Sequence, residues 1–131
     1  GRIGIPGFAA YSAGKFGLRG AAEALRREWG EGPVRIHHIA PRAVRTAFNA
    51  GPVEAYNQAT GTASDPPEVV ADAVCSALGE PSGERFLGSP ERFAAPLNGL
   101  APGLLDGAFA KHRQVLHRLW SRATGSASVN P

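Results

Sequence analysis

The sequence predicts an α/β fold of the doubly wound class, in which helices cover both faces of a parallel sheet. Segments 34–40 and 84–88 have the composition of strands, and each lies between segments with helical periodicity. Strands that alternate with helices are joined by crossovers and run parallel. Two strands do not make a stable sheet by themselves. We therefore expect the carboxyl-terminal half of such a domain, with extra helices after it.

Composition excludes several classes of protein. The chain has 131 residues, enough for one domain, and its net charge is +3. The basic residues are scattered rather than gathered in a stripe, so we expect no nucleic-acid partner. No apolar run approaches the ~20 residues of a membrane span. The single cysteine, Cys75, excludes an internal disulfide and favours a reducing compartment, so we expect a cytoplasmic protein.

The first helix is predicted over residues 8–29, where apolar and small residues recur at intervals of three and four. These positions are Phe8, Tyr11, Gly14 or Lys15, Leu18, Ala22, Leu25 and Trp29. Glycines at 14, 17 and 20 each cost up to about 1 kcal/mol inside a helix, so we expect another backbone to pack closely there. The glycines and proline of segment 30–33 end the helix.

A buried strand is predicted next, over residues 34–40. His37 and His38 are adjacent and point to opposite faces, so they cannot bind one metal ion together, and we expect both to be hydrogen-bonded. Segment 41–46 leaves the carboxyl end of this strand, where open α/β sheets bind ligands. Segment 47–62 is either a mobile lid with a short helix or an ordinary surface connection.

A second helix opens at residues 64–68, with Ser64 or Asp65 as its cap, and ends at Gly79. Its expected buried residues are Val69, Val70, Ala73, Val74, Ala77 and Leu78. After strand 84–88, another helix begins at 89–93, and the proline-containing segment 96–102 interrupts it. An amphipathic helix over 101–122 is expected to pack within the molecule or a dimer, and contact with an anionic membrane is the alternative. Residues 123–131 are expected to be a disordered tail.

Tyr11 and Lys15 are candidates for chemistry because a helix places them one turn apart on a single face. An ammonium group close to a phenol favours the phenolate and lowers the pKa of the phenol. A tyrosine of that kind can serve as a general acid or base. The alternative is structural: a lysine whose stem lies along a packed tyrosine.

Four features together resemble the carboxyl-terminal half of the short-chain dehydrogenases/reductases. They are Tyr11-Ser12-Ala13-Gly14-Lys15 (the family's Tyr-x-x-x-Lys), the strand 34–40, Pro41…Val44-x-Thr46 (Pro-Gly-x-Val-x-Thr), and the helix opening at Asp65. The resemblance covers roughly residues 1–90, and Arg42 stands where the family usually has glycine. It implies the second half of a Rossmann-like domain over residues 1–100, with the amphipathic helix 101–122 added.

The resemblance implies an NAD- or NADP-dependent oxidoreductase that acts on an alcohol or carbonyl substrate. Tyr11 would exchange a proton with the substrate oxygen, and Lys15 would tune Tyr11 and bind the nicotinamide ribose, so both face the cofactor. Pro41 and Val44, with the Thr46 hydroxyl, would hold the nicotinamide carboxamide. The helix that contains Tyr11 would join subunits in a homo-oligomer.

The family's glycine-rich cofactor loop and its catalytic serine would precede Gly1. We therefore expect this stretch alone to be an inactive fragment of the enzyme. The alternative is a non-catalytic remnant of the family that acts through self-association or by binding a partner.

Overall fold

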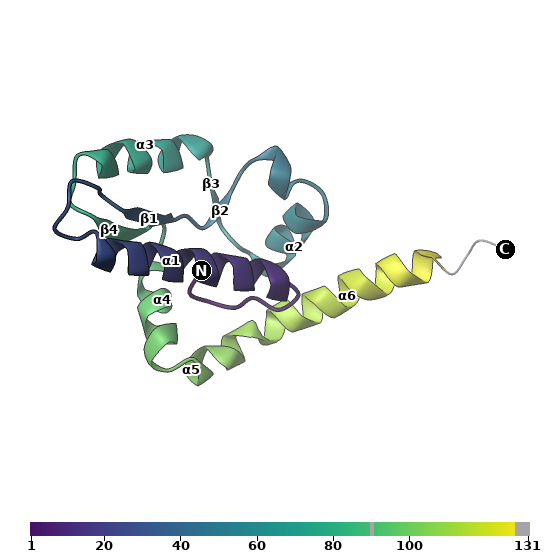
Figure 1. Cartoon of the computed structure of the whole chain (residues 1–131). Coiled ribbons are helices and arrows are strands. Elements are labelled where there is room, and N and C mark those ends of the chain that lie inside the picture. Colours follow the sequence, from purple (N-terminus) through teal and green to yellow (C-terminus); the bar gives the residue numbers. More distant parts are fainter. Residues whose placement is uncertain (90, 128–131) are drawn as a thin grey trace.

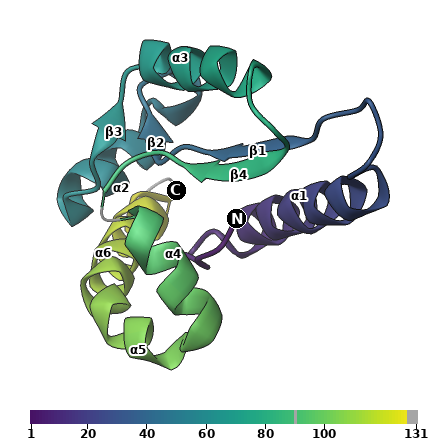
Figure 2. The same ribbon diagram turned by 90° about the vertical axis from the view of Figure 1, so that its left-hand side faces the viewer.

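A computed structural model describes residues 1–89 and 91–127 of the chain. Its centre is a layered unit in which helix α1 (Ala9–Glu28) lies on one face of strands β1 (His37–Ala40) and β4 (Gly83–Phe86). Helix α3 (Pro67–Leu78) covers the opposite face, as Figures 1 and 2 show from two directions. The mixed α/β class is confirmed, whereas a full doubly wound sheet is not present in the described residues.

Strands β1 and β4 are parallel, with His37 opposite Gly83 and Ala40 opposite Phe86. Strand β1 is shorter than the predicted 34–40 because β4 begins only at Gly83 and offers no earlier partner. The N–H of Ile36 instead donates to Ser82 Oγ at 2.9 Å. The second strand was predicted over 84–88 and lies one to two residues earlier.

A second parallel pair, β2 (Ala43–Val44) with β3 (Ser64–Asp65), was not predicted. Two-residue strands are too short to leave a periodic signal in the sequence. Between them the chain forms a 3₁₀ turn, η1 (Ala47–Asn49), and helix α2 (Pro52–Thr60). The short helix expected within 47–62 is therefore confirmed.

The expected close packing along the glycines of α1 is wrong for the described residues. A Cβ atom added at Gly14, Gly17 or Gly20 would have no neighbour within 4 Å outside the helix. These glycines face open space. The helix itself begins and ends within one residue of the predicted 8–29.

The carboxyl-terminal part contains α4 (Glu91–Leu100), α5 (Gly103–Asp106), the 3₁₀ turn η2 (Gly107–Phe109) and α6 (Ala110–Ala127). The predicted interruption from residue 96 is wrong, because α4 continues through Pro96 and is held by the burial of Ala95 and a hydrogen bond from Asn98 to the Arg2 carbonyl. The predicted single helix is divided at 107–109. Helix α6 also extends to residue 127, so a disordered tail from 123 is wrong up to that point, since no proline stops the helix. Residues 128–131 lie outside the described residues.

The core of the described residues is small. Its buried apolar side chains are Tyr56, Ala73, Ala77, Ala95 and Val115. The predicted buried face of α3 is only partly correct, because Leu78 is 69% exposed and Val69 and Val74 are also exposed. A two-stranded sheet is too narrow to cover more than the central alanines of the helix. None of the helices described here is long and apolar enough to cross a membrane.

Candidate functional site

Tyr11 and Lys15 lie together in the first half of α1, as predicted. Lys15 Nζ is positioned over the Tyr11 ring, 5.3 Å from its centroid, in cation–π geometry. Phe8 meets the same ring edge-on, with 6.4 Å between centroids. The Tyr11 side chain is 54% exposed, and no described residue forms a hydrogen bond with its hydroxyl. The hydroxyl is thus available to a ligand.

The segment predicted to hold the nicotinamide carboxamide, residues 41–46, lies at the carboxyl end of β1. Pro41 is exposed in the connection to β2, and Val44 belongs to β2, where its carbonyl accepts a hydrogen bond from Asn49 Nδ2 at 2.6 Å. Thr46 is exposed and begins η1, and its carbonyl accepts the Asn49 N–H at 3.0 Å. Within the described residues, no hydrogen bond or ring contact joins Pro41, Val44 or Thr46 to Tyr11 or Lys15.

Arg42 has a role that the sequence did not reveal. Its guanidinium forms a two-point hydrogen bond with Asp65, from Nε to Oδ2 at 2.9 Å and from Nη2 to Oδ1 at 2.5 Å. The hydrogen bond from Arg42 lowers the pKa of the Asp65 carboxyl. No described non-glycine residue has a positive φ, so arginine at the family's glycine position causes no backbone strain.

Asp65 is therefore not the helix cap that we expected. Pro66 occupies the N-cap position of α3, and no side chain caps the helix. Asp65 is 8% exposed and pairs with Arg42, 23 residues earlier in the chain. The departure from glycine at position 42 was the one sequence signal that could have pointed to this pair.

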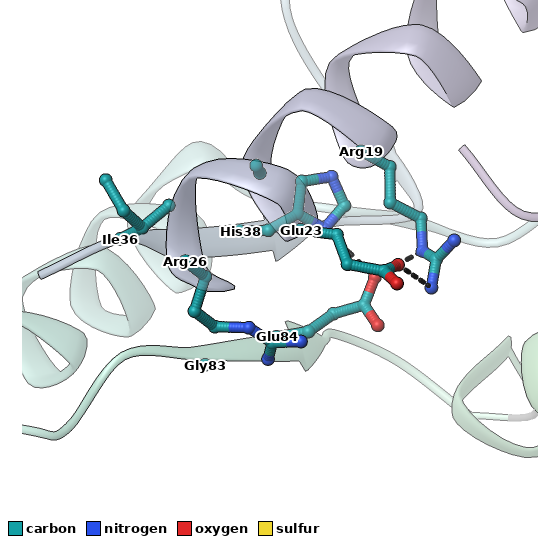
Figure 3. Close-up of a pocket in the computed structure, with 8 residues that line it drawn as sticks. Arg19, Glu23, Arg26, Ile36, His38, Gly83 and Glu84 are labelled. Atoms are coloured by element: carbon teal, nitrogen blue, oxygen red, sulfur yellow. Dashed lines mark hydrogen bonds and ion pairs between the residues drawn. The ribbon is translucent and has the colours of Figure 1, made fainter. Parts of the chain in front are cut away.

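Glu84, on β4, is the centre of an ionic cluster between α1 and the sheet (Figure 3). It accepts hydrogen bonds from Arg2 Nη2 at 2.5 Å and from Arg19 Nε at 2.8 Å. Burial alone would raise the pKa of Glu84, but the hydrogen bonds and charges of the two arginines outweigh it and lower the pKa. The cluster fixes α1, and with it Tyr11 and Lys15, on the sheet.

His38 projects from β1 toward the same cluster (Figure 3). Its Nδ1 lies 3.2 Å from Glu84 Oε1, but neither this atom nor His37 Nε2 has a hydrogen-bond partner among the described residues. The expectation of hydrogen-bonded strand histidines is therefore wrong for these two ring nitrogens. The cavity beside His38 measures about 20 Å³, room for roughly one water molecule.

A larger cavity of about 310 Å³ opens between residues 4–6, the first turns of α1, and the η2–α6 region. Ala9 and Ser12 line it from α1, while Asp106, Phe109 and Arg113 line the other side. Its size is at the lower end of the range for small-molecule sites. Tyr11 does not line it. In the part of the chain described here, no three His, Cys, Asp or Glu side chains are grouped to hold a metal ion.

Part of the chain matches a known protein family. Residues 1–57 match the family described as short chain dehydrogenase, a segment that includes Tyr11, Lys15 and the loop from Pro41 to Thr46. No curated protein and no solved structure matches the chain. The match supports an oxidoreductase-type family and covers three of the four features on which the resemblance rests, all but the helix opening at Asp65. Residues 1–57 are thus similar to the short-chain dehydrogenases, which supports membership of that family for the N-terminal part of the chain.

Proposed function

We propose that the chain is part of an NAD(P)-dependent oxidoreductase that transfers a hydride between nicotinamide and an alcohol or carbonyl compound. The observation that carries the proposal is the Tyr11–Lys15 pair inside the segment that matches the family. The phenol is exposed and its hydroxyl has no partner among the described residues. A buried and hydrogen-bonded phenol would instead have favoured the structural alternative.

Tyr11 is proposed as the general acid/base. Its exposed hydroxyl can donate a proton to a carbonyl oxygen, or accept one from an alcohol, when a substrate lies against this face of α1. Lys15 is within cation–π distance, so its positive charge offsets the negative charge that develops on the phenol as the proton leaves.

The residues present fit the nicotinamide half of NAD or NADP. The Thr46 side chain is exposed, and neither its hydroxyl nor the Lys15 ammonium has a hydrogen-bond or ion-pair partner within the described residues. Both would be free for the carboxamide and the ribose, beside Pro41 and Val44. Nicotinamide, when bound, supplies or takes up the hydride. No glycine-rich turn after a strand occurs in this sequence to hold the pyrophosphate.

Segment 47–62 is proposed as the substrate lid. It begins where segment 41–46, the proposed nicotinamide-binding segment, ends. Helix α2 makes it an ordered helix rather than an extended connection. The exposed thiol of Cys75 supports a cytoplasmic location, since free thiols persist in reducing compartments.

Replacing Tyr11 by Phe tests the catalytic proposal. The experiment compares the variant and the wild type in the longest reading frame that contains this chain, by following formation of reduced nicotinamide with a panel of small alcohols. Loss of a general acid/base typically costs about 10²- to 10⁴-fold in turnover, while nucleotide affinity should change little. Lys15→Ala should reduce both turnover and affinity. Undiminished turnover in the Tyr11→Phe protein contradicts the assignment.

Self-association is the second candidate function, and one observation favours it. Along α1, Tyr11, Leu18, Leu25 and Trp29 are 54%, 59%, 43% and 45% exposed and recur at helical intervals. We propose that a second copy of the chain covers this apolar stripe.

Light scattering measures this directly. Leu18→Lys should convert a dimer into a monomer, whereas Leu78→Lys, at a comparably exposed leucine of α3, should leave the dimer intact. A wild-type chain that is monomeric, or an equal effect of the two substitutions, removes this candidate.

A further inference from the structure

The lid is anchored at its base. The strands that flank it, β2 and β3, pair with each other, with Ala43 opposite Ser64 and Val44 opposite Asp65. The Arg45 N–H adds a hydrogen bond of 2.9 Å to the Asp65 carbonyl, and the Arg42–Asp65 pair crosses the same junction. The excursion from 46 to 63 is thus closed at its base, and its position depends on what holds α2.

Helix α2 lies against α6, as Figure 1 shows. The contact centres on Tyr56, which is 5% exposed and whose hydroxyl lies 2.8 Å from Nδ1 of His112. The two rings are 5.7 Å apart, and Phe109 lies 5.1 Å from the imidazole. Lys111 Nζ donates to the Thr60 carbonyl at 3.2 Å, at the carboxyl end of α2, where a cation is favourable.

The contact also reaches the candidate acid/base. Phe8 meets Tyr56 edge-on at 5.4 Å and meets Tyr11 edge-on at 6.4 Å. One ring therefore touches both the lid helix and the residue proposed to move the proton. A change in the Tyr56–His112 contact changes what Phe8 packs against.

We propose that His112 of α6 is a positioning residue that holds the lid helix α2 beside the Tyr11 face through its hydrogen bond with Tyr56. The role of the lid rests on the proposed function, whereas the contact itself does not. A neutral imidazole accepts a hydrogen bond from the Tyr56 O–H at Nδ1. A protonated imidazole carries hydrogen on both nitrogens and can only donate to the phenol oxygen, and it places a charge in this part-buried contact.

The surroundings of His112 give the contact a pH dependence. Burial and the neighbouring charge of Lys111 lower the pKa of His112, and burial raises the pKa of Tyr56. Glu54, the other titratable residue of α2, is hydrogen-bonded to Gln58, and Arg113 of α6 donates to the Asp106 carbonyl. Because folding lowers the pKa of His112, docking is complete above its ordinary value of 6.5 and weakens as the pH falls below that value.

Hydrogen exchange in α2 tests the proposal on the chain as it stands. Loss of one neutral hydrogen bond should speed exchange in a peptide spanning α2 about two- to tenfold in Tyr56→Phe and His112→Ala. The Tyr56→Phe side chain keeps its ring, so it remains informative if His112→Ala fails to fold. His117→Ala, at an exposed histidine of the same helix, is the matched control and should leave α2 unchanged.

A conservative variant separates positioning from packing. His112→Asn keeps an acceptor near the Nδ1 position but cannot titrate. Protection of α2 against exchange should therefore be higher than in His112→Ala, and it should not fall between about pH 7.5 and about pH 5.5. Protection that is unaffected by Tyr56→Phe, or that falls with acid equally in the wild type and in His112→Asn, overturns the proposal. Neither readout involves turnover. If only the dehydrogenase assignment is wrong, Tyr11→Phe retains its turnover while Tyr56→Phe still weakens the protection of α2.

Discussion

Replacing Glu84 by Gln tests whether the ionic cluster fixes α1 to the sheet. The Glu84 side chain is 18% exposed, and those of Arg2 and Arg19 are each 25% exposed, so solvent screens the interaction only in part. Glutamine keeps the shape but has a single acceptor oxygen, so one arginine loses its charge-assisted hydrogen bond and faces an N–H₂ group. Such a bond contributes about 1.5–3 kcal/mol. We expect a loss of about 2 kcal/mol and a fall in Tm of roughly 8 °C for a chain of this size.

The pH dependence gives this prediction a second test. Because folding lowers the pKa of Glu84, its stabilising contribution is complete above the ordinary glutamate value of 4.5 and is lost as the pH falls through the folded value. Glutamine cannot titrate there. The difference in unfolding free energy between wild type and variant should therefore be largest at neutral pH and shrink as the solution is acidified below that value.

The measurement is urea unfolding followed by circular dichroism, at neutral pH and over an acid series. Glu80→Gln is the matched control, because Glu80 forms an ion pair with Arg85 that is more exposed to solvent. The two side chains are 52% and 34% exposed. An exposed pair contributes about 0.2–1 kcal/mol. The reasoning is refuted if the two substitutions destabilise the chain equally, or if the loss at Glu84 does not depend on pH.

Two further predictions concern the N-terminal segment and the base of the lid. Gly7→Ala should cost about 1–2 kcal/mol in thermal unfolding, because Gly7 has a φ of 83° and a Cβ there would lie 2.8 Å from the Leu116 methyl groups. Gly4→Ala, which meets nothing within 4 Å, is its control, and an equal loss at both glycines would contradict the assignment. The Asp65 carboxyl should titrate below its ordinary value of 3.8 by NMR and move up toward that value in Arg42→Ala; an unchanged midpoint would argue against the pairing.

The features that the sequence predicted correctly are those that neighbouring residues decide. The bounds of α1 followed from its apolar spacing, and the same spacing placed Lys15 next to Tyr11. The parallel β1–β4 arrangement followed from strands separated by helices, because a crossover of that length joins parallel strands. The role of Tyr11 remains a prediction, since it depends on a substrate and a cofactor.

The tertiary structure alone decided which distant residues meet. Arg42 reaches Asp65 across 23 positions, Tyr56 reaches His112 across 56, and Arg2 reaches Glu84 across 82. Each pairing depends on how whole elements dock, and no local periodicity records that information. Burial followed the same rule: the sequence determined by itself which residues are apolar and on which face of a helix they lie. The width of the sheet decided how many of them are covered, because a side chain is buried only where a neighbouring element reaches it.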